Sequence, residues 1–366
     1  MQSDQQHVVH VVGARPNFPK AAPVLAALER YDVRQTLVHT GQHYDSNLSS
    51  VFLEQLGMPT PDVYLGVGSG THGHQTAAVM TALEGMFAAE RPDLVVVYGD
   101  INSTAAAALV AAKGGIRLAH VEAGLRSFDR TMPEEINRVV VDRLADLLLT
   151  TSVDAVGHLA REGVAADRIH FVGNPMIDSL LRCRPEPADQ SARSDLDLPH
   201  RYALATLHRP GNVDDDAHAA ALVHAMHAVA DRIDIALPLH PRGRSRLTAA
   251  GLLDHPRMHV VDPMAYLPFL ALLSDAALVI TDSGGIQEES TVLGVPCLTV
   301  RPNTERPVTI TDGTNRLVEP TELPEAVAEV LAAGRPSHWP TPPLWDGHAG
   351  ERIAAILARA LAAGPA

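Results

Sequence analysis

The sequence has little cysteine and few aromatic residues. Two of its 366 residues are cysteines, Cys183 and Cys297, and Phe, Trp and Tyr together make up 4%. Two cysteines are too few for a disulfide framework, so we expect a reducing environment. Hydrophobic residues nevertheless make up 46% of the chain. The core must therefore be built mainly from alanine, valine and leucine.

The sequence also lacks an excess of basic residues. It has 29 Lys and Arg against 43 Asp and Glu, a formal net charge of -14. A nucleic-acid binder needs a basic face, so the charge excludes nucleic acid as a partner. A small anionic ligand is compatible with the charge if a few cations converge locally.

Long apolar runs are absent as well. No run reaches the length of a membrane span, and the polar N-terminus has no recognisable signal peptide. We therefore expect a soluble, cytoplasmic protein without a membrane partner.

Strand and helix patterns alternate along the chain. Apolar runs predict strands at 7–13, 33–39, 94–100, 118–124, 147–151 and 169–174, and beyond a polar linker at 182–200 they predict strands at 202–209, 235–242, 258–261, 277–281 and 296–301. Helices are predicted at 50–57 and 75–89 among others. Such alternation indicates parallel, doubly wound sheets. We predict an α/β protein of two Rossmann-like domains facing a cleft, residues 1–175 and 176–350, with a final helix in 351–366 that completes the first domain.

The stretch from Thr281 to Ser290, TDSGGIQEES, is predicted to form a strand end, a Gly-Gly turn and a helix start. Gly284 and Gly285 let the backbone approach a ligand, and the amide groups of a helix start attract an anion. The pattern fits a site for the diphosphate and ribose of a nucleotide sugar. It also fits an ordinary strand–helix turn with a Ser or Asp cap, and the stretch alone does not decide between them.

Carboxylates follow successive strands of the first half. Asp100 and Glu122 stand at strand ends, and Glu134 follows in the first turn of a helix that Pro133 can begin. The cations nearest to them in this arrangement are Arg15, Lys20, Arg126 and Arg138. Because the carboxyl ends of parallel strands form the ligand-binding edge of such sheets, we expect acid–base chemistry at this edge.

The second half supplies cations and histidines at its strand ends. The side chains suited to a diphosphate are His208, Arg209, His240, Ser283 and Arg306. His72 and His74 have no third ligand at a suitable spacing, so we expect surface histidines and no metal.

Taken together, these motifs resemble the non-hydrolysing UDP-N-acetylglucosamine 2-epimerases over nearly the whole chain. Each motif is weak alone, but their order is specific. The stretches that carry the resemblance are GARP…K from Gly13, GD at Gly99, HVEAGLR from His120, PEEINR from Pro133, HR at His208, HP at His240, DSGGIQEE from Asp282 and TERP from Thr304. The resemblance implies the two-domain GT-B architecture, a homodimer, and no metal or nicotinamide cofactor.

The family resemblance also implies a reaction. A base removes the C2 proton while UDP leaves C1, and a proton and UDP then add back to the bound 2-acetamidoglucal. The implied catalytic residues are Asp100, Glu122, Glu134 and His208. The implied substrate contacts are Arg15, Lys20, Arg138, Arg209, His240, Phe269, Ser283, Gly284, Gly285, Glu289 and Arg306.

Departures from the family pattern keep alternatives open. The family's Gln-His segment for a second, regulatory UDP-GlcNAc is matched by Gln42-His43, but the loop from Gly66 to Gly73 has no arginine. A hydrolysing variant that releases ManNAc and UDP, and a differently substituted sugar such as a diacetamido-uronate, are both compatible with the motifs. A GT-B glycosyltransferase and a non-catalytic UDP-sugar sensor are further alternatives.

Overall fold

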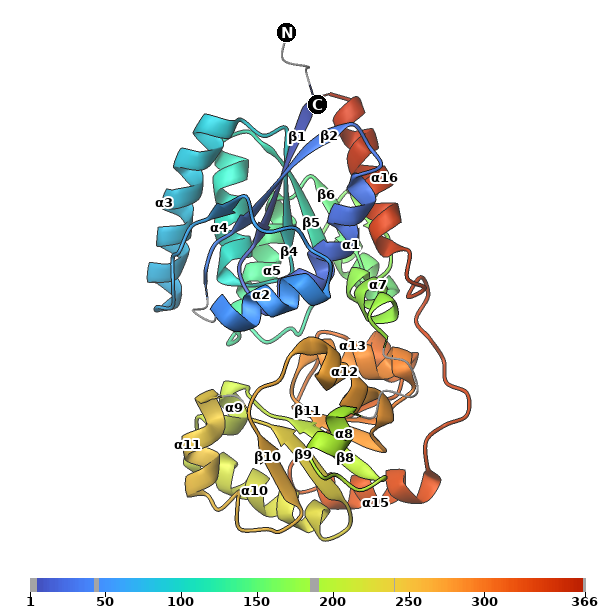
Figure 1. Ribbon diagram of the computed structural model, residues 1–366. Helices are drawn as coiled ribbons and strands as arrows, with labels where there is room; N and C mark the ends of the chain where they lie inside the picture. Colours follow the sequence, from blue (N-terminus) through green and yellow to red (C-terminus); the bar gives the residue numbers. More distant parts are fainter. Residues whose placement is uncertain (1–4, 43–45, 185–190, 240, 365–366) are drawn as a thin grey trace. The chain divides into compact units, whose positions relative to one another are not determined.

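The computed structural model describes residues 5–42, 46–184, 191–239 and 241–364. The chain divides into two compact units, residues 1–183 together with 343–366, and residues 184–342. Each unit contains a parallel sheet with flanking helices (Figure 1). The predicted α/β class with two Rossmann-like sheets is therefore confirmed.

The sheet of the first unit has the strand order β3-β2-β1-β4-β5-β6-β7. Its strands are β1 (Gln6–Val12), β2 (Val33–His39), β3 (Val63–Tyr64), β4 (Leu94–Tyr98), β5 (Arg117–Ala123), β6 (Leu147–Thr150) and β7 (Ile169–Phe171). The order reverses between β1 and β4, which pair in parallel. Such a switch point is where open α/β sheets bind ligands, beyond the carboxyl ends of the strands.

Helices pack on both faces of this sheet. They are α1 (Phe18–Leu28), α2 (Ser46–Gln55), α3 (His72–Glu90), α4 (Asn102–Lys113), α5 (Pro133–Leu144), α6 (Val153–Arg161), α7 (Pro175–Arg182) and the C-terminal α16 (Ala349–Ala362), with short 3-10 turns at Arg15–Asn17 and Ala166–Arg168. Helix α16 packs against α1 from the other end of the chain (Figure 1). The buried Asp178 carboxylate holds its start by accepting the amides of Ala349 and Gly350 at 3.1 and 2.7 Å.

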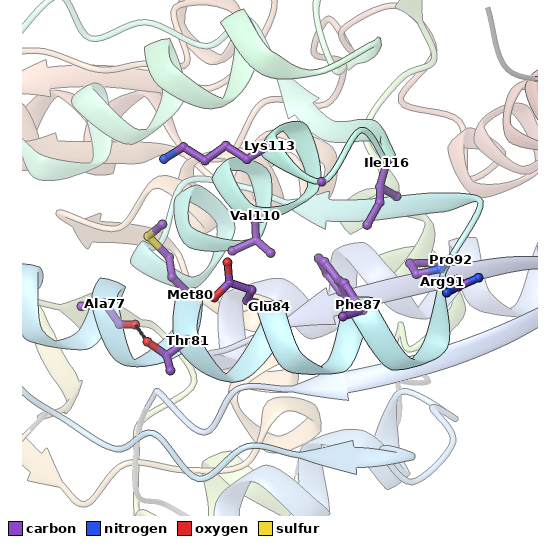
Figure 2. Close-up of a pocket in the computed structure, with 12 residues that line it drawn as sticks. Ala77, Met80, Thr81, Glu84, Phe87, Arg91, Pro92, Val110, Lys113 and Ile116 are labelled. Carbon is purple, nitrogen blue, oxygen red and sulfur yellow. Dashed lines mark hydrogen bonds between the residues drawn. The ribbon is translucent and has the colours of Figure 1, made fainter.

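A hollow lies on the outer surface of the first unit between α3 and α4. Figure 2 shows Met80 and Phe87 of α3 facing Val110 of α4. Pro92 and Ile116, which also line it, come just before β4 and β5. The hollow is therefore near the amino ends of these strands, away from the edge where the polar motifs gather.

The sheet of the second unit has the order β10-β9-β8-β11-β12-β13. Its strands are β8 (Tyr202–Thr206), β9 (Asp234–Pro238), β10 (Met258–Val261), β11 (Leu278–Thr281), β12 (Cys297–Val300) and β13 (Asn315–Val318). Its helices are α8 (Ser191–Asp195), α9 (Pro210–Val213), α10 (Asp216–Ala230), α11 (Pro241–Ala249), α12 (Tyr266–Asp275), α13 (Gly284–Leu293), α14 (Val308–Thr311) and α15 (Leu323–Ala333). Here the order reverses between β8 and β11.

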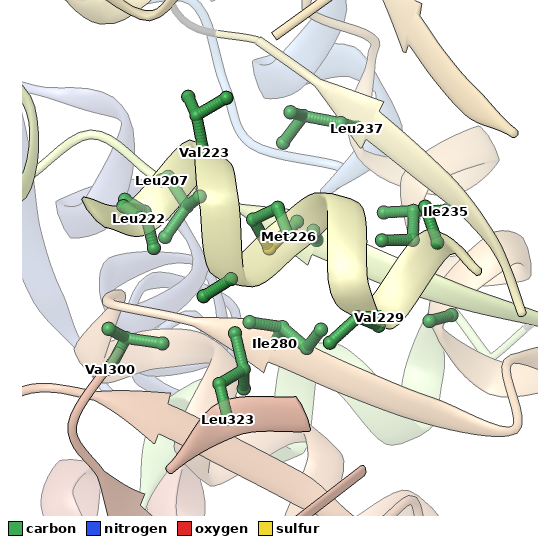
Figure 3. Close-up of a cluster of buried hydrophobic side chains, with 14 of the residues drawn as sticks. Leu207, Leu222, Val223, Met226, Val229, Ile235, Leu237, Ile280, Val300 and Leu323 are labelled. Carbon is green, nitrogen blue, oxygen red and sulfur yellow. The ribbon is translucent and has the colours of Figure 1, made fainter. Parts of the chain in front are cut away.

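The core of the second unit forms around α10. Met226 is fully buried, and Figure 3 shows it among Val229, Ile235 and Ile280. Alanine, valine and leucine dominate the buried residues of both units. This composition confirms the expectation drawn from the scarcity of aromatic residues.

Several predicted boundaries were wrong. The strand predicted at 202–209 ends at Thr206, and the one predicted at 235–242 ends at Pro238, because Pro241 begins α11. Helix α3 begins at His72 instead of residue 75. The short strands β3 and β13 were not predicted, and the predicted linker contains α8. In the described residues no helix is long and apolar enough to cross a membrane.

Candidate functional site

In the first unit, the turn after β1 is tied to the end of β4. The Asn17 side chain accepts a hydrogen bond from the Gly13 amide at 3.0 Å and donates one to the Tyr98 carbonyl at 2.8 Å. This bridge closes the Arg15–Asn17 turn over the switch point. Asn17 was not predicted as a site residue, because a polar residue in a turn gives no indication of its long-range partner.

Lys20 and Glu122 form a buried ion pair at this edge. Lys20 lies in the first turn of α1, and its ammonium contacts the Glu122 carboxylate at the end of β5. Their side chains are 7% and 5% exposed. Glu122 has a φ of 76°, a left-handed conformation that costs a non-glycine residue about 1–2 kcal/mol. A conformation of this cost persists only where surrounding contacts enforce it, and such residues concentrate at functional sites.

Gly99 provides the space for this ion pair. Its φ is 63°, and a Cβ at this position would lie 3.0 Å from both the Glu122 carboxylate and the Lys20 ammonium. Gly115 has a φ of 66° but nothing within 4 Å of the same position. Substitutions at these two glycines therefore distinguish the effect of backbone strain, which both would cause, from the effect of crowding the ion pair, which only Gly99 would cause.

We expect Gly99→Ala and Gly115→Ala to lose similar stability, about 1 kcal/mol each, from left-handed strain. Gly99→Ala should in addition lower turnover by about tenfold or more, because it displaces the ion pair. The measurements are the free energy of unfolding and steady-state turnover of both variants. Equal turnover in the two variants would show that the space beside Gly99 does not matter.

Asp100 follows Gly99 and pairs with a different cation. Its carboxylate contacts the Arg138 guanidinium of α5, and its carbonyl accepts from the Asn137 side chain at 2.8 Å. The Asp100 side chain is 24% exposed, whereas that of Arg138 is 2% exposed. The site edge thus carries two separate carboxylate–cation pairs.

Glu135, which was not among the predicted site residues, supports Arg138. It contacts the guanidinium at 2.7 Å and accepts the amides of Ser127 and Phe128 at 2.9 and 3.0 Å. Burial alone would raise the pKa of Glu135, but the bonds from Ser127 and Arg138 hold it below the ordinary value. Its neighbour Glu134 is half-buried in the first turn of α5. Successive helical residues point about 100° apart, so the PEEINR stretch alone did not show which glutamate supports Arg138.

Arg126 and Arg15 are placed differently from the other cations. Arg126 is buried and contacts Asp142 at 2.7 Å and Glu162 at 2.8 Å, so its charge is compensated by carboxylates of the same unit. The Arg15 guanidinium is half-buried and lies 6.0 Å from the centre of the Phe52 ring.

In the second unit, Asp282 organises the switch point between β8 and β11. Its buried carboxylate accepts the amides of His208 and Arg209 at 3.0 and 2.9 Å, and the Asn212 side chain at 3.0 Å. The His208 ring contacts it at 3.0 Å through Nδ1. Burial alone would raise the pKa of Asp282, but these bonds, first that of His208, lower it. Its position directly after a strand was the signal that could have identified it.

The first turn of α13 faces the Arg306 guanidinium. A Cβ on Gly284 would overlap this guanidinium, and it would also lie 2.9 Å from the Glu305 carboxylate. A helix start and an adjacent arginine both favour an anion. Arg306 is itself buried, contacting Glu305 and, at 3.0 Å, Glu288.

The remaining predicted residues of the second unit surround this turn. Ser283 is half-buried, and its amide donates to the Thr281 hydroxyl at 3.0 Å. Gly285 occupies the first turn of α13, and Phe269 is half-buried in α12. His240 lies outside the described residues. Within the described part of the chain, no group of three or more His, Cys, Asp and Glu side chains could hold a metal ion.

Glu289 is buried in the second unit. Its carboxyl accepts the Tyr266 hydroxyl at 2.9 Å. Burial raises the pKa of Glu289 to about 7, and the nearby Glu288 adds to the effect. Because the folded protein binds this proton more tightly than the unfolded chain does, stability must fall as the pH rises from about 4.5 through 7.

We expect Glu289→Gln to remove this loss of stability. Glutamine keeps an acceptor for Tyr266 but carries no charge, so the variant should gain about 3 kcal/mol relative to the wild type between pH 5 and 8.5. Urea unfolding at both pH values measures this difference. Glu329→Gln, which removes an exposed partner of Arg316, is the control. Parallel pH profiles for the wild type and Glu289→Gln would contradict the prediction.

The two Rossmann-like sheets, each with polar side chains beyond its switch point, define an α/β protein of the GT-B-like class. A family model described as UDP-N-acetylglucosamine 2-epimerase matches residues 26–358. The chain belongs to this family, which makes it an isomerase.

Individual relatives cover most of the chain. A UDP-N-acetylglucosamine 2-epimerase of Methanocaldococcus jannaschii is 39% identical over 357 residues, 95% of this chain and 97% of the relative. The UDP-2,3-diacetamido-2,3-dideoxy-D-glucuronate 2-epimerase of Pseudomonas aeruginosa is 42% identical over 317 residues, 85% and 88% of the two chains. The crystal structure of the M. jannaschii UDP-GlcNAc 2-epimerase in complex with UDP-GlcNAc and UDP matches with a TM-score of 0.90, covering 97% of this chain and all of that one.

Proposed function

We propose that this protein interconverts UDP-N-acetylglucosamine and UDP-N-acetylmannosamine without hydrolysing them. The observation that carries the proposal is the pair of carboxylates at the first switch point, each beside its own cation: Glu122 with Lys20, and Asp100 with Arg138. Inversion at C2 needs acid–base groups on both faces of the sugar, which a single carboxylate does not supply. The names of relatives that are 37–39% identical over 95% of the chain support the same substrate.

The proposed reaction has two steps. A base takes the C2 proton, the C2–H electron pair becomes the C1=C2 double bond, and the C1–O pair leaves with UDP. A proton then adds to the opposite face of C2 while a UDP oxygen attacks C1. Asp100, Glu122 and Glu134 are the candidate acids and bases, and Lys20 and Arg138 orient the first two.

The second unit stabilises the departing diphosphate in this proposal. The first turn of α13, Arg306 and Arg209 present positive charge, and the His208 ring a polar contact, where negative charge develops on UDP. The C2 proton is weakly acidic, so this assistance to the leaving group lowers the barrier for breaking the C2–H bond.

One experiment separates the candidate functions. The protein is incubated with UDP-N-acetylglucosamine alone in heavy water, and proton NMR spectra are recorded. Deuterium at C2 together with UDP-N-acetylmannosamine is the expected result. Free N-acetylmannosamine and UDP would indicate a hydrolysing enzyme, and an unchanged spectrum would indicate a transferase or a sensor.

A second candidate substrate is UDP-2,3-diacetamido-2,3-dideoxy-D-glucuronate. It is favoured by the 42% identity to the P. aeruginosa enzyme that bears this name. The same heavy-water experiment with both sugars, compared by kcat/KM, decides between them. A clearly higher kcat/KM for the uronate would make it the substrate in place of UDP-N-acetylglucosamine. The proposed acid–base chemistry would stay the same.

We also expect no requirement for a second nucleotide sugar. The Gln42 side-chain oxygen is occupied by the Ser103 amide at 3.2 Å and hydroxyl at 2.8 Å, and the loop from Gly66 to Gly73 carries no permanent cation. His43 lies outside the described residues. The reverse reaction from UDP-N-acetylmannosamine should therefore start without a lag. A reaction that begins only after a trace of UDP-N-acetylglucosamine is added would contradict this expectation.

The proposal includes a cytoplasmic homodimer, as the family resemblance implies. Light scattering after size-exclusion chromatography measures the mass directly. A mass equal to that of one 39.0 kDa chain would exclude the dimer.

A further inference from the structure

We propose that His120 is a positioning residue: its doubly protonated ring holds the Gly99–Asp100 turn against the end of β5, where Glu122 stands. The proposal rests on the function proposed above for its effect on turnover. The protonation of the ring stands on hydrogen-bond geometry alone.

The His120 ring is fully buried on β5, and each nitrogen faces an oxygen. Nε2 lies 2.8 Å from the Gly99 carbonyl, and Nδ1 lies 2.6 Å from the Asp142 carboxylate. A carbonyl oxygen only accepts hydrogen bonds, so Nε2 must carry a proton.

Asp142 can accept a proton donor at Nδ1 because its carboxylate is ionised. Its second oxygen accepts the Gly124 amide at 3.0 Å and the Arg126 guanidinium at 2.7 Å. Nδ1 therefore carries a proton as well, and the ring is an imidazolium.

The charges around the ring balance in this state. His120 and Arg126 carry two positive charges, and Asp142 and Glu162, which Arg126 contacts at 2.8 Å, carry two negative ones. A neutral ring would leave this largely buried group with one uncompensated negative charge, which is costly in the interior.

The contacts of His120 and Asp142 fix both the Gly99–Asp100 turn and the end of β5 at Glu122. The Gly99 amide donates to the Val121 carbonyl at 3.0 Å, and the His120 ring binds the Gly99 carbonyl, so β5 holds this residue at both ends. Asp100 comes next in the chain. Asp142 also anchors residues on both sides of Glu122, through the His120 ring and the Gly124 amide. The strained Glu122 backbone is thus held between two fixed points.

NMR of the wild-type protein labelled with ¹⁵N-histidine tests the protonation. At pH 8, His120 is expected to show an attached proton on both ring nitrogens. His10 is the internal control, because it is equally buried, its Nδ1 lies 2.7 Å from the Tyr98 hydroxyl, and burial lowers its pKa to about 3. It should show one protonated nitrogen. A His120 ring with a single proton would overturn the proposal, whatever the protein catalyses.

Asp142→Asn tests the positioning role. The ring should lose one proton, and kcat should fall roughly 10–100-fold because the reacting groups are misplaced. UDP affinity, measured by calorimetry, should stay unchanged, since the UDP-binding residues belong to the second unit. Wild-type kcat in a variant with a neutral ring would overturn the role, as would equal losses of kcat and UDP affinity.

His120→Gln is the second variant, in case Asp142→Asn does not fold. Glutamine can supply one donor but not two in fixed directions, so the same fall in kcat is expected. His158→Gln is the matched control, because His158 is also buried but contacts the same loop through one nitrogen, at 2.9 Å from the Gly124 carbonyl. A fall in kcat for His158→Gln as large as that for His120→Gln would overturn the role of the imidazolium. Absence of turnover in the wild type would refute the proposed function. The NMR experiment would still test whether the His120 ring is doubly protonated.

Discussion

Glu122→Gln is expected to lower turnover of UDP-N-acetylglucosamine by roughly 10²–10⁴-fold, the range that general acid–base catalysis contributes. Glutamine has nearly the same shape but neither accepts nor returns a proton at neutral pH. UDP affinity should change little, because the residues assigned to UDP belong to the other unit. Steady-state kinetics and calorimetry with UDP measure the two effects separately, and Asp100→Asn is expected to behave in the same way.

Glu122→Gln also removes the ion-pair partner of Lys20, and this effect needs its own control. Glu122→Gln leaves the Lys20 ammonium, on a side chain that is 7% exposed, without its carboxylate, which destabilises a protein by about 3–5 kcal/mol. The double variant Lys20→Met/Glu122→Gln removes both charges and should regain stability without regaining turnover. Glu90→Gln, which removes the exposed partner of Arg34, is the surface control and should leave turnover unchanged.

Near-normal turnover in both Glu122→Gln and Asp100→Asn would remove these carboxylates from the mechanism. Turnover that returns in the double variant would show that the loss came from the unpaired lysine and not from the missing base.

His208→Ala is expected to weaken UDP binding roughly 10- to 100-fold, the effect of one charge-assisted hydrogen bond to phosphate. The ionised Asp282 holds Nδ1 of the ring at 3.0 Å, and the His208 side chain is 45% exposed. The ring is therefore oriented by a buried anion, and its partial exposure leaves it accessible to a ligand. Breaking of the C1–O bond should slow as well, because the same contact stabilises the leaving diphosphate.

His218→Ala is the matched control for this prediction. His218 contacts Asp215 at 3.4 Å on the surface of the same unit, where both side chains are exposed, and its removal should leave UDP affinity unchanged. Calorimetric titration of the two variants with UDP makes the comparison. An unchanged dissociation constant for His208→Ala would place the ring outside the binding site.

The positions of the candidate groups could be predicted because strand ends are local features. An apolar run followed by Gly-Asp or His-Arg identifies a carboxyl end, and parallel strands bring these ends to one edge. Asp100, Glu122, His208 and the turn before α13 were predicted at such ends, and the structure has each directly after or within the last residues of its strand. The sequence did not show the strand order, in which β1 lies beside β4, because sheet neighbours depend on contacts between distant residues.

The partners of the buried charges could not be predicted either. Arg126 was expected among the cations near the site, yet it lies with Asp142 and Glu162, 16 and 36 residues away. Asp282 and Glu135 belong to motifs that were identified in the sequence, but neither was predicted as a site residue. In the structure they orient His208 and Arg138. These pairings form only when separate elements meet.

The sequence by itself determined the α/β class, the alternation of elements and the family, because apolar periodicity and short motifs are properties of adjacent residues. Tertiary structure decided which carboxylate meets which cation, which glycine leaves room for an ion pair, and which histidine is held at both ring nitrogens. The physical reason is that an interior charge or strained backbone is stable only where partners from several elements compensate it, and the chain acquires those partners only by folding.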